Sequence, residues 1–189
     1  HEPSRRQRQM CIRDSHHPIE MQNYLLDILL SSGKEFNLKL VGARAQNWLR
    51  QEKSYKAFGS DLGRDAGPFE SKLSRFVDIN KNFLGKDALL KRKTDVSCVT
   101  LLIDGPKDID PWGREALYNE TEEVMLGRLT SAGYSVHFKR SIGIGYVKSS
   151  FSEVGTKLRI KIDDAFWDAE IVRDSPYDPQ NERIIDRAQ

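Results

Sequence analysis

The spacing of the hydrophobic residues changes near residue 95. In the segment 18–33, PIEMQNYLLDILLSSG, apolar side chains recur every three or four positions, which is the period of a helix with one buried face. These side chains are Ile19, Tyr24, Leu25, Ile28 and Leu29. The pattern therefore predicts a helix over 18–33, with Gly33 as its C-terminal cap.

Four shorter segments follow before residue 95. The alternation in EFNLKLVG (35–42) predicts a short strand, and SRFVDI (74–79) predicts another. ARAQNWLRQEK (43–53) predicts a second helix. GKDALLKRK (85–93) predicts a brief helix whose last turn is basic, which suits the negative end of the helix dipole. This first part of the chain therefore mixes helices with strands.

Beyond residue 95 the hydrophobic segments are short and are separated by Gly, Asp, Pro and Ser. Strands at such close and even spacing predict a small antiparallel β-barrel or a sandwich. In one of them Lys157, Arg159 and Lys161 alternate with apolar residues, which predicts a strand with one solvent-exposed face and one buried face. The six expected strands are 97–104, 115–118, 123–136, 141–147, 156–162 and 166–172.

These patterns place the chain in the α+β class, and we choose the barrel for its second part. The boundary falls near residues 93–97. Residues 16–95 are expected to form a mixed α/β portion, 96–180 an antiparallel β-barrel and 181–189 a tail. We expect residues 96–173 to be the more compact unit.

The first fifteen residues follow neither pattern. Residues 5–15, RRQRQMCIRDS, are similar to one reading frame of the adapter used in transposon-based sequencing libraries. We therefore expect residues 1–15 to be an artefactual segment and leave them out of the fold. On this interpretation the coding sequence before His16 is missing. The chain is then a C-terminal fragment, and the apolar face of the 18–33 helix is under-buried.

Composition and charge narrow the function. The 189 residues are 38% hydrophobic and 31% charged, with a formal charge of +2. Residues 1–15 hold four arginines against Glu2 and Asp14, so the rest of the chain has 26 basic and 26 acidic residues. This balance removes the electrostatic reason to expect nucleic acid or an anionic membrane as a partner. No apolar run is long enough to span a bilayer.

The cysteines and histidines indicate neither a disulfide scaffold nor a metal site. Two cysteines, Cys11 and Cys98, are too few for a disulfide scaffold, and they lack the spacing of metal ligands. With no secretory signal, we expect a reducing, cytoplasmic location. Cys98 lies in an apolar run and is expected to be a small core residue rather than a nucleophile.

Candidate chemistry concentrates in LRQEKSYKAFG. Arg50, Lys53, Tyr55 and Lys56 gather donors and an aromatic ring near a helix end. An arginine fork beside a tyrosine ring suits a planar ligand that carries carboxylates. A solvated helix with a Glu52–Lys56 pair at i,i+4 spacing explains the same residues. The residue types alone leave both interpretations open.

Four ordered blocks resemble the C-terminal part of the aminomethyltransferase superfamily, typified by the T-protein of the glycine cleavage system. The blocks are LRQEKSYKAFGSDL, GPFESKLSRFVDINKNFLGKDALL, LTSAGYSVHFKRSIGIGYV and GTKLRIKI. The resemblance covers roughly residues 18–180. Glu52–Lys53 followed by YKAFG, and the ending AEIVRDSPYDPQNERI, look closest to the C-terminal unit of the FAD-dependent dimethylglycine and sarcosine dehydrogenases.

The resemblance implies an activity and its cofactors. Domains of this family bind tetrahydrofolate, which captures a one-carbon unit released from a small methylated amine or an aminomethyl donor. Proximity supplies much of the catalysis, because the reactive carbon is trapped before it diffuses away. FAD would bind only through an upstream domain, since the chain has no dinucleotide fingerprint. The catalytic residues are expected upstream as well, so the isolated fragment should be inactive.

Five residues carry over from the family as candidates for folate contact. Arg50 matches the arginine of the family's Leu-Arg-x-Glu block and is expected to pair with a carboxylate of the glutamate tail or to orient the site. Tyr55 matches an aromatic residue of the dehydrogenase subgroup, and Tyr118 and Tyr134 lie where the family places aromatic residues near the folate channel. Arg44 echoes the family's Gly-Ala-Arg-Asp pattern, although an ungapped alignment puts Gln46 at that place. The five residues are Arg44, Arg50, Tyr55, Tyr118 and Tyr134.

Three other interpretations stay open within the superfamily. One is a stand-alone T-protein, and another is a regulatory copy like the phosphatase-regulatory relatives. The third is a folate-binding module without catalysis, as in the iron–sulfur assembly relatives. KNFLGKDA (81–88) argues against this module because it lacks the cysteine of the Lys-Gly-Cys-Tyr-x-Gly-Gln-Glu hallmark.

Overall fold

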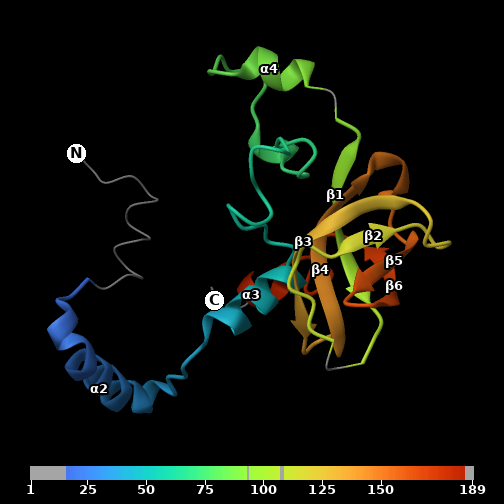
Figure 1. Ribbon diagram of the computed structural model, residues 1–189. Helices are drawn as coiled ribbons and strands as arrows, with labels where there is room; N and C mark the ends of the chain where they lie inside the picture. The colour runs from blue at the N-terminus through green and yellow to red at the C-terminus, as the bar shows by residue number, and fades with distance from the viewer. Residues whose placement is uncertain (1–15, 93, 107–108, 186–189) are drawn as a thin grey trace. The chain divides into compact units, whose positions relative to one another are not determined.

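The structure is a computed structural model that describes residues 16–92, 94–106 and 109–185 (Figure 1). The segment expected to derive from an adapter, residues 1–15, lies outside the described residues, so its origin stays a prediction. The chain divides into two units, one that ends at Val41 and one that begins at Gly42.

Within its described residues, 16–41, the first unit contains one α-helix, so the helix predicted over 18–33 is confirmed. No residue of this helix is buried, which agrees with the expectation that its apolar face lacks cover. Ile28 and Leu29 are 40% and 49% exposed. The elements are η1 (Ile19–Met21), α2 (Gln22–Ser32) and η2 (Gly33–Phe36).

The strand predicted over 35–42 is wrong. The chain turns through η2, Asn37 takes a left-handed φ of 53°, and no regular element follows before Gly42. Phe36 and Leu40 are largely exposed. An alternating pattern becomes a strand only when a neighbouring strand accepts its hydrogen bonds, and none of the described strands pairs with this segment.

The second unit is built around a closed barrel of antiparallel strands in the order β1-β4-β3-β2-β5-β6 (Figure 1). All six predicted strands are confirmed. The barrel closes where β1 pairs with β6, with Leu101 opposite Ile171. The strands are β1 (Val96–Ile103), β2 (Ala116–Tyr118), β3 (Met125–Ser135), β4 (Arg140–Lys148), β5 (Lys157–Ile162) and β6 (Ala165–Val172).

The barrel interior is the hydrophobic core of this unit. In β5, Leu158 and Ile160 are buried, whereas Lys157 and Lys161 on the other face are exposed, as the alternation predicts. Cys98 is also buried, at 1% exposure, although it does not belong to the cluster inside the barrel. This confirms the expectation that it is a small buried residue.

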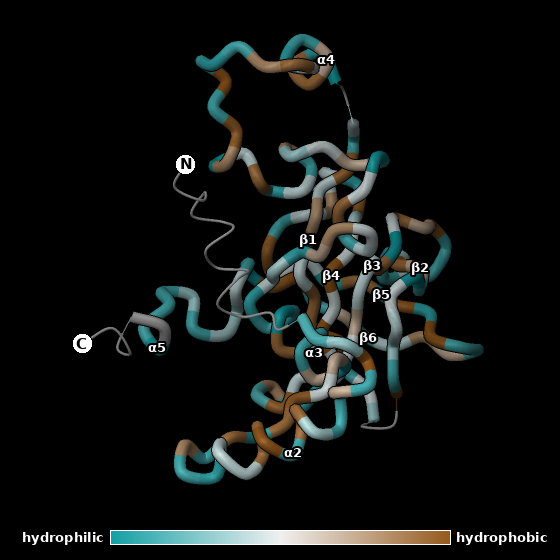
Figure 2. The backbone as a smooth tube through the Cα atoms, turned by 90° about the vertical axis from the view of Figure 1, so that its left-hand side faces the viewer, coloured by the Kyte–Doolittle hydropathy of each residue, from teal (hydrophilic) through white to brown (hydrophobic). Residues whose placement is uncertain are grey.

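Residues 42–92 add short helices outside the barrel. The helices predicted over 43–53 and 85–93 are confirmed, as α3 (Ala43–Glu52) and α4 (Lys86–Lys91). The strand predicted over 74–79 is wrong, because SRF forms the 3-10 helix η3 (Ser74–Phe76). Apolar side chains around α4 are exposed, and Figure 2 shows hydrophobic stretches there and in α2.

Helix α3 packs against β3 and β4 (Figure 1). The contact depends on Gly133, because a Cβ there would lie 2.1 Å from Cδ1 of the Trp48 ring. The segment that follows β6 forms hydrogen bonds with the C-terminal end of α3. Tyr177 N–H donates to the Glu52 carbonyl (3.1 Å), and Ser175 Oγ donates to the Lys53 carbonyl (2.7 Å). The last described element is α5 (Glu182–Ile185).

Candidate functional site

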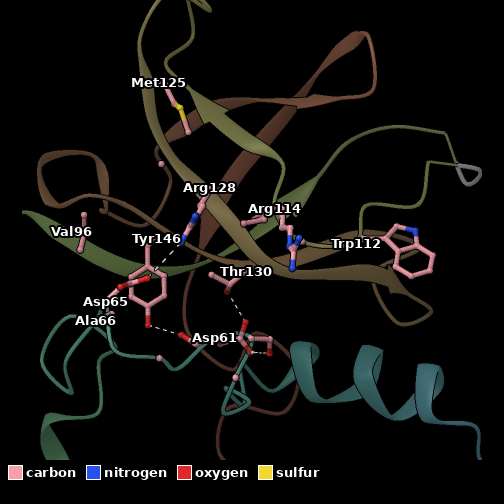
Figure 3. Close-up of a pocket in the computed structure, with 16 residues that line it drawn as sticks. Asp61, Asp65, Ala66, Val96, Trp112, Arg114, Met125, Arg128, Thr130 and Tyr146 are labelled. Atoms are coloured by element: carbon pink, nitrogen blue, oxygen red, sulfur yellow. Dashed lines mark hydrogen bonds and ion pairs between the residues drawn. The ribbon is translucent and has the colours of Figure 1, made fainter.

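A cleft of about 940 Å³ lies between the loop that follows α3 and the outside of the barrel (Figure 3). The loop supplies lining residues between Gly59 and Ala66. The barrel supplies the turn 112–114, residues 127–130 of β3 and Tyr146 of β4. Polar groups and apolar side chains such as Met125 share its surface.

Two arginines, Arg114 and Arg128, line the cleft (Figure 3). A terminal nitrogen of Arg128 is 3.9 Å from the Asp65 carboxylate, and both side chains are mostly solvated, so this pair is weak. Arg114 is exposed as well. Both guanidinium groups are therefore accessible to an anionic ligand.

The turn that carries Arg114 has an unusual backbone. Gly113 has a φ of 92° and Arg114 a φ of 130°, a region that side chains rarely adopt. Gly113 is required, because a Cβ there would lie 2.6 Å from the Thr130 carbonyl oxygen. The Glu115 carboxylate fixes the turn by accepting the main-chain N–H groups of Trp112 (2.8 Å) and Gly113 (2.9 Å). Local interactions thus hold Arg114 at the cleft.

Asp61 is a fully buried carboxylate at the base of the loop. It accepts a hydrogen bond from Thr130 Oγ1 on β3 at 2.6 Å (Figure 3) and another from Ser131 Oγ, also at 2.6 Å. The main-chain N–H of Ala57 donates to it as well, at 2.9 Å. Its counter-ion is Arg50, whose Nη1 lies 2.6 Å from Oδ2.

The guanidinium of Arg50 is directed at this network. Its Nη1 also donates to the Tyr55 carbonyl (2.9 Å), and its Nη2 donates to Ser131 Oγ (2.7 Å). Its Nε donates to Asn47 (2.8 Å). These bonds occupy four of the five N–H donors of an arginine. Arg50 is adjacent to the cleft but does not line it.

Tyr146 joins the loop to the strand β4. Its hydroxyl donates to the Asp61 carbonyl (2.9 Å) and shares a hydrogen bond with Ser71 Oγ (2.7 Å). Burial raises the pKa of Tyr146 to about 12. The phenol therefore stays protonated at neutral pH and can donate.

Two of the other predicted residues, Arg44 and Tyr134, contact the same tryptophan, Trp48. Arg44 lies over the rings of Trp48 (5.1 Å) and Trp112 (5.3 Å), and Trp112 lines the cleft. Tyr134 contacts Trp48 edge to face, with ring centroids 6.4 Å apart. These two predicted residues therefore share one aromatic cluster at the cleft.

Tyr55 and Tyr118 lie elsewhere. The Tyr55 side chain is 51% exposed. Tyr118 contacts Phe166 edge to face, at 5.3 Å between ring centroids, where β2 and β6 flank β5. Neither tyrosine lines the cleft. Glu52, predicted as a possible partner of Lys56, is buried, and its carboxylate accepts the hydroxyl of Ser135.

Sequence reasoning did not identify the residues that line the cleft. Asp61, Arg114, Arg128 and Tyr146 were not among the candidates. One signal was present: Arg128 interrupts an otherwise apolar strand segment. Nothing in the sequence indicated that the loop after α3 faces β3.

Two negative findings hold for the described residues. No group of three or more His, Cys, Asp or Glu side chains could hold a metal ion in the part of the chain that the structure describes. Among the helices in the described ranges, none has the length and apolar character needed to cross a membrane. Cys98 is also unsuited to nucleophilic chemistry, because burial raises the pKa of its thiol to about 11.

Comparison with known proteins identifies two family models in the chain. Residues 97–178 match the glycine cleavage T-protein C-terminal barrel domain, and residues 15–81 match the GCVT N-terminal domain. The chain is 32% identical over 166 residues to mitochondrial dimethylglycine dehydrogenase of Mus musculus, which covers 84% of the chain and 18% of that protein. It is 30% identical over 146 residues to an aminomethyltransferase of Caldanaerobacter subterraneus, which covers 77% of the chain and 39% of that protein.

Two further similarities concern an oxidase and a solved structure. 4-Methylaminobutanoate oxidase (formaldehyde-forming) of Paenarthrobacter nicotinovorans is 29% identical over 170 residues, 87% of this chain and 20% of that one. The crystal structure of the glycine cleavage system aminomethyltransferase T from Bartonella henselae superposes with a TM-score of 0.71 at 20% identity. This match covers 86% of this chain and 45% of that one, and it supports the fold. The chain thus spans less than half the length of each of these proteins.

Proposed function

Because the chain belongs to the glycine cleavage T-protein superfamily, we propose that its cleft binds tetrahydrofolate as part of a one-carbon transfer unit. The observation that carries this proposal is the pair of accessible arginines beside apolar and aromatic surface in one cleft. The volume of about 940 Å³ lies within the range of small-molecule sites.

The chemistry of the cleft matches the two ends of a folate. The glutamate tail carries carboxylates, and Arg114 and Arg128 offer guanidinium forks for them. The pterin and aryl rings are flat and partly apolar, and Trp112 with Met125 offers the matching surface. The Tyr146 ring, which also lines the cleft, adds aromatic surface, while its hydroxyl stays bound to Asp61 and Ser71.

The residues carried over from the family extend this proposal. Arg44 and Tyr134 would support the ring-binding side through Trp48 and Trp112. Arg50 would act on the ligand through Asp61. Tyr55 and Tyr118 stay candidates for contact, and their Phe variants test the contribution of each hydroxyl.

The finer proposal concerns the parent protein. We infer that it is a dimethylglycine or sarcosine dehydrogenase-like enzyme, because similar proteins are named for the oxidation of methylated amines. FAD would then bind outside residues 1–189, and tetrahydrofolate in this unit would capture the one-carbon product. The chain's own residues would hold the acceptor and exclude water around the reacting carbon.

A stand-alone aminomethyltransferase is the second candidate. The similarity to a bacterial aminomethyltransferase, 30% identical over 77% of this chain, supports it. The upstream reading frame distinguishes the two candidates. A dinucleotide-binding fingerprint favours the dehydrogenase, and a short T-protein-like start favours the aminomethyltransferase.

Calorimetric titration of the chain with tetrahydrofolate tests the proposed site. Arg114→Ala and Arg128→Ala should each raise Kd by about tenfold or more, because each removes a charged hydrogen-bond donor. Arg140→Ala is the matched control, since Arg140 pairs with Asp104 and does not line the cleft. Equal Kd values for the wild type and both cleft variants would contradict the proposed site.

A further inference from the structure

The loop that forms one wall of the cleft is attached to the barrel mainly through one residue. We infer that Asp61 is a positioning residue, whose buried carboxylate and Arg50 counter-ion hold the loop 57–66 in the geometry that a ligand requires. The expected effect of Asp61 on tetrahydrofolate binding rests on the proposed function, whereas its expected effect on the loop does not.

Asp61 links three segments that are far apart in the sequence. Its carboxylate is bound by Arg50 of α3 and by Thr130, which is 69 positions away on β3. Its carbonyl oxygen accepts the hydroxyl of Tyr146 on β4. The same residue therefore fixes both its side chain and its peptide group to the second wall of the cleft.

The other links between the loop and the barrel are longer: Ser131 Oγ lies 3.4 Å from Ser60 Oγ, and Arg128 lies 3.9 Å from the Asp65 carboxylate. Phe58 is 92% exposed, and Gly59, with a φ of 94°, and Ser60 are exposed too. The residues from Gly63 to Asp65 are also exposed. Because the flanking side chains contact mostly solvent, the position of the loop should depend on Asp61.

The charge of Asp61 is as important as its shape. A buried carboxylate is tolerated because Arg50 neutralises it, and removal of one partner leaves the other charge buried and unpaired. Asp61→Asn keeps the volume and can still accept from Ala57 N–H. The double variant Asp61→Asn/Arg50→Gln removes both charges together, so it should be less disturbed than either single variant.

Hydrogen exchange measured by mass spectrometry on the whole chain tests this inference without any ligand. Asp61→Asn and Arg50→Gln should each speed the exchange of the amides in 57–66 by about tenfold or more, while those in β1 and β4 are unchanged. The double variant should recover part of the protection. Glu120→Gln is the control, because Glu120 is an exposed carboxylate that belongs neither to the loop nor to the cleft.

Two outcomes would overturn the inference. One is unchanged exchange of 57–66 in Asp61→Asn, and the other is an equal loss of protection in the loop and in the barrel strands, which indicates general stability. If Asp61→Asn does not fold, Thr130→Ala decides between the same outcomes, since it removes a single donor to Asp61.

Titration of the same variants with tetrahydrofolate then separates the two proposals. Asp61→Asn should raise Kd by about tenfold, whereas Glu120→Gln, at an exposed residue outside the cleft, should change it little. A wild-type chain that does not bind tetrahydrofolate, but whose loop responds to Asp61→Asn as expected, contradicts the proposed function and supports the positioning role.

Discussion

At the scale of single residues, the sequence indicated which side chains have useful chemistry but not the direction in which they point. Arg50 was identified as a donor for a carboxylate, and the structure shows it bound to the carboxylate of Asp61. Of the two arginines that do line the cleft, Arg128 interrupts an apolar strand segment, whereas Arg114 has no distinctive sequence context. A side chain's direction depends on tertiary contacts, which a single sequence does not contain.

Glu70 shows how such contacts change the behaviour of a side chain. It is 8% exposed, its carboxylate accepts the Thr94 hydroxyl, and Arg92 Nε lies 3.3 Å away. Burial alone would raise its pKa, but the hydrogen bond from Thr94, main-chain hydrogen bonds and Arg92 hold the pKa below the ordinary 4.5. Its carbonyl also accepts the N–H of Cys98 (2.7 Å), so Glu70 ties the segment before β1 to the barrel.

We therefore predict an acid-dependent contribution of Glu70 to stability. Because its folded pKa is below the unfolded value, this contribution is complete above pH 4.5 and is lost as the pH falls through the folded pKa. Glu70→Gln should lower the free energy of unfolding at neutral pH and flatten its decline in acid. Urea unfolding at several pH values measures both effects. Glu120→Gln, an exposed control, should change neither, and parallel curves for wild type and Glu70→Gln would contradict the prediction.

At the scale of elements, the prediction succeeded where local pattern and tertiary environment agreed. The six barrel strands were found because each is a short hydrophobic run bounded by turn residues, and each has neighbouring strands to pair with in the closed barrel. The two strands predicted over 35–42 and 74–79 were wrong, because the described structure has no neighbouring strand to pair with them. The cleft was not predictable, because its walls meet through contacts such as Asp61–Thr130, 69 positions apart.

The packing of α3 on β3 leads to an element-scale prediction. Gly133→Ala should destabilise the protein by roughly 1–3 kcal/mol, because the new Cβ would collide with the Trp48 ring. Gly63→Ala is the control, since a Cβ there meets nothing within 4 Å. Denaturant unfolding measures both. In the Trp48→Ala background the cost of Gly133→Ala should nearly vanish, and an unchanged cost would contradict the packing argument.

At the scale of the whole molecule, the chain combines a complete barrel with a less buried first part. The barrel carries most of the buried apolar residues, whereas α2 has none. The cleft lies entirely within the unit that begins at Gly42. We therefore expect ligand binding to depend on the contacts between the barrel and the loop after α3, rather than on α2.

Hydrogen exchange of the chain with and without saturating tetrahydrofolate is the most direct test of this account. We predict new protection in the loop 59–66, in the turn 112–114 and in residues 127–130, because these segments line the cleft. No change in these segments, or protection confined to the barrel face around Tyr118 and Phe166, would contradict the account.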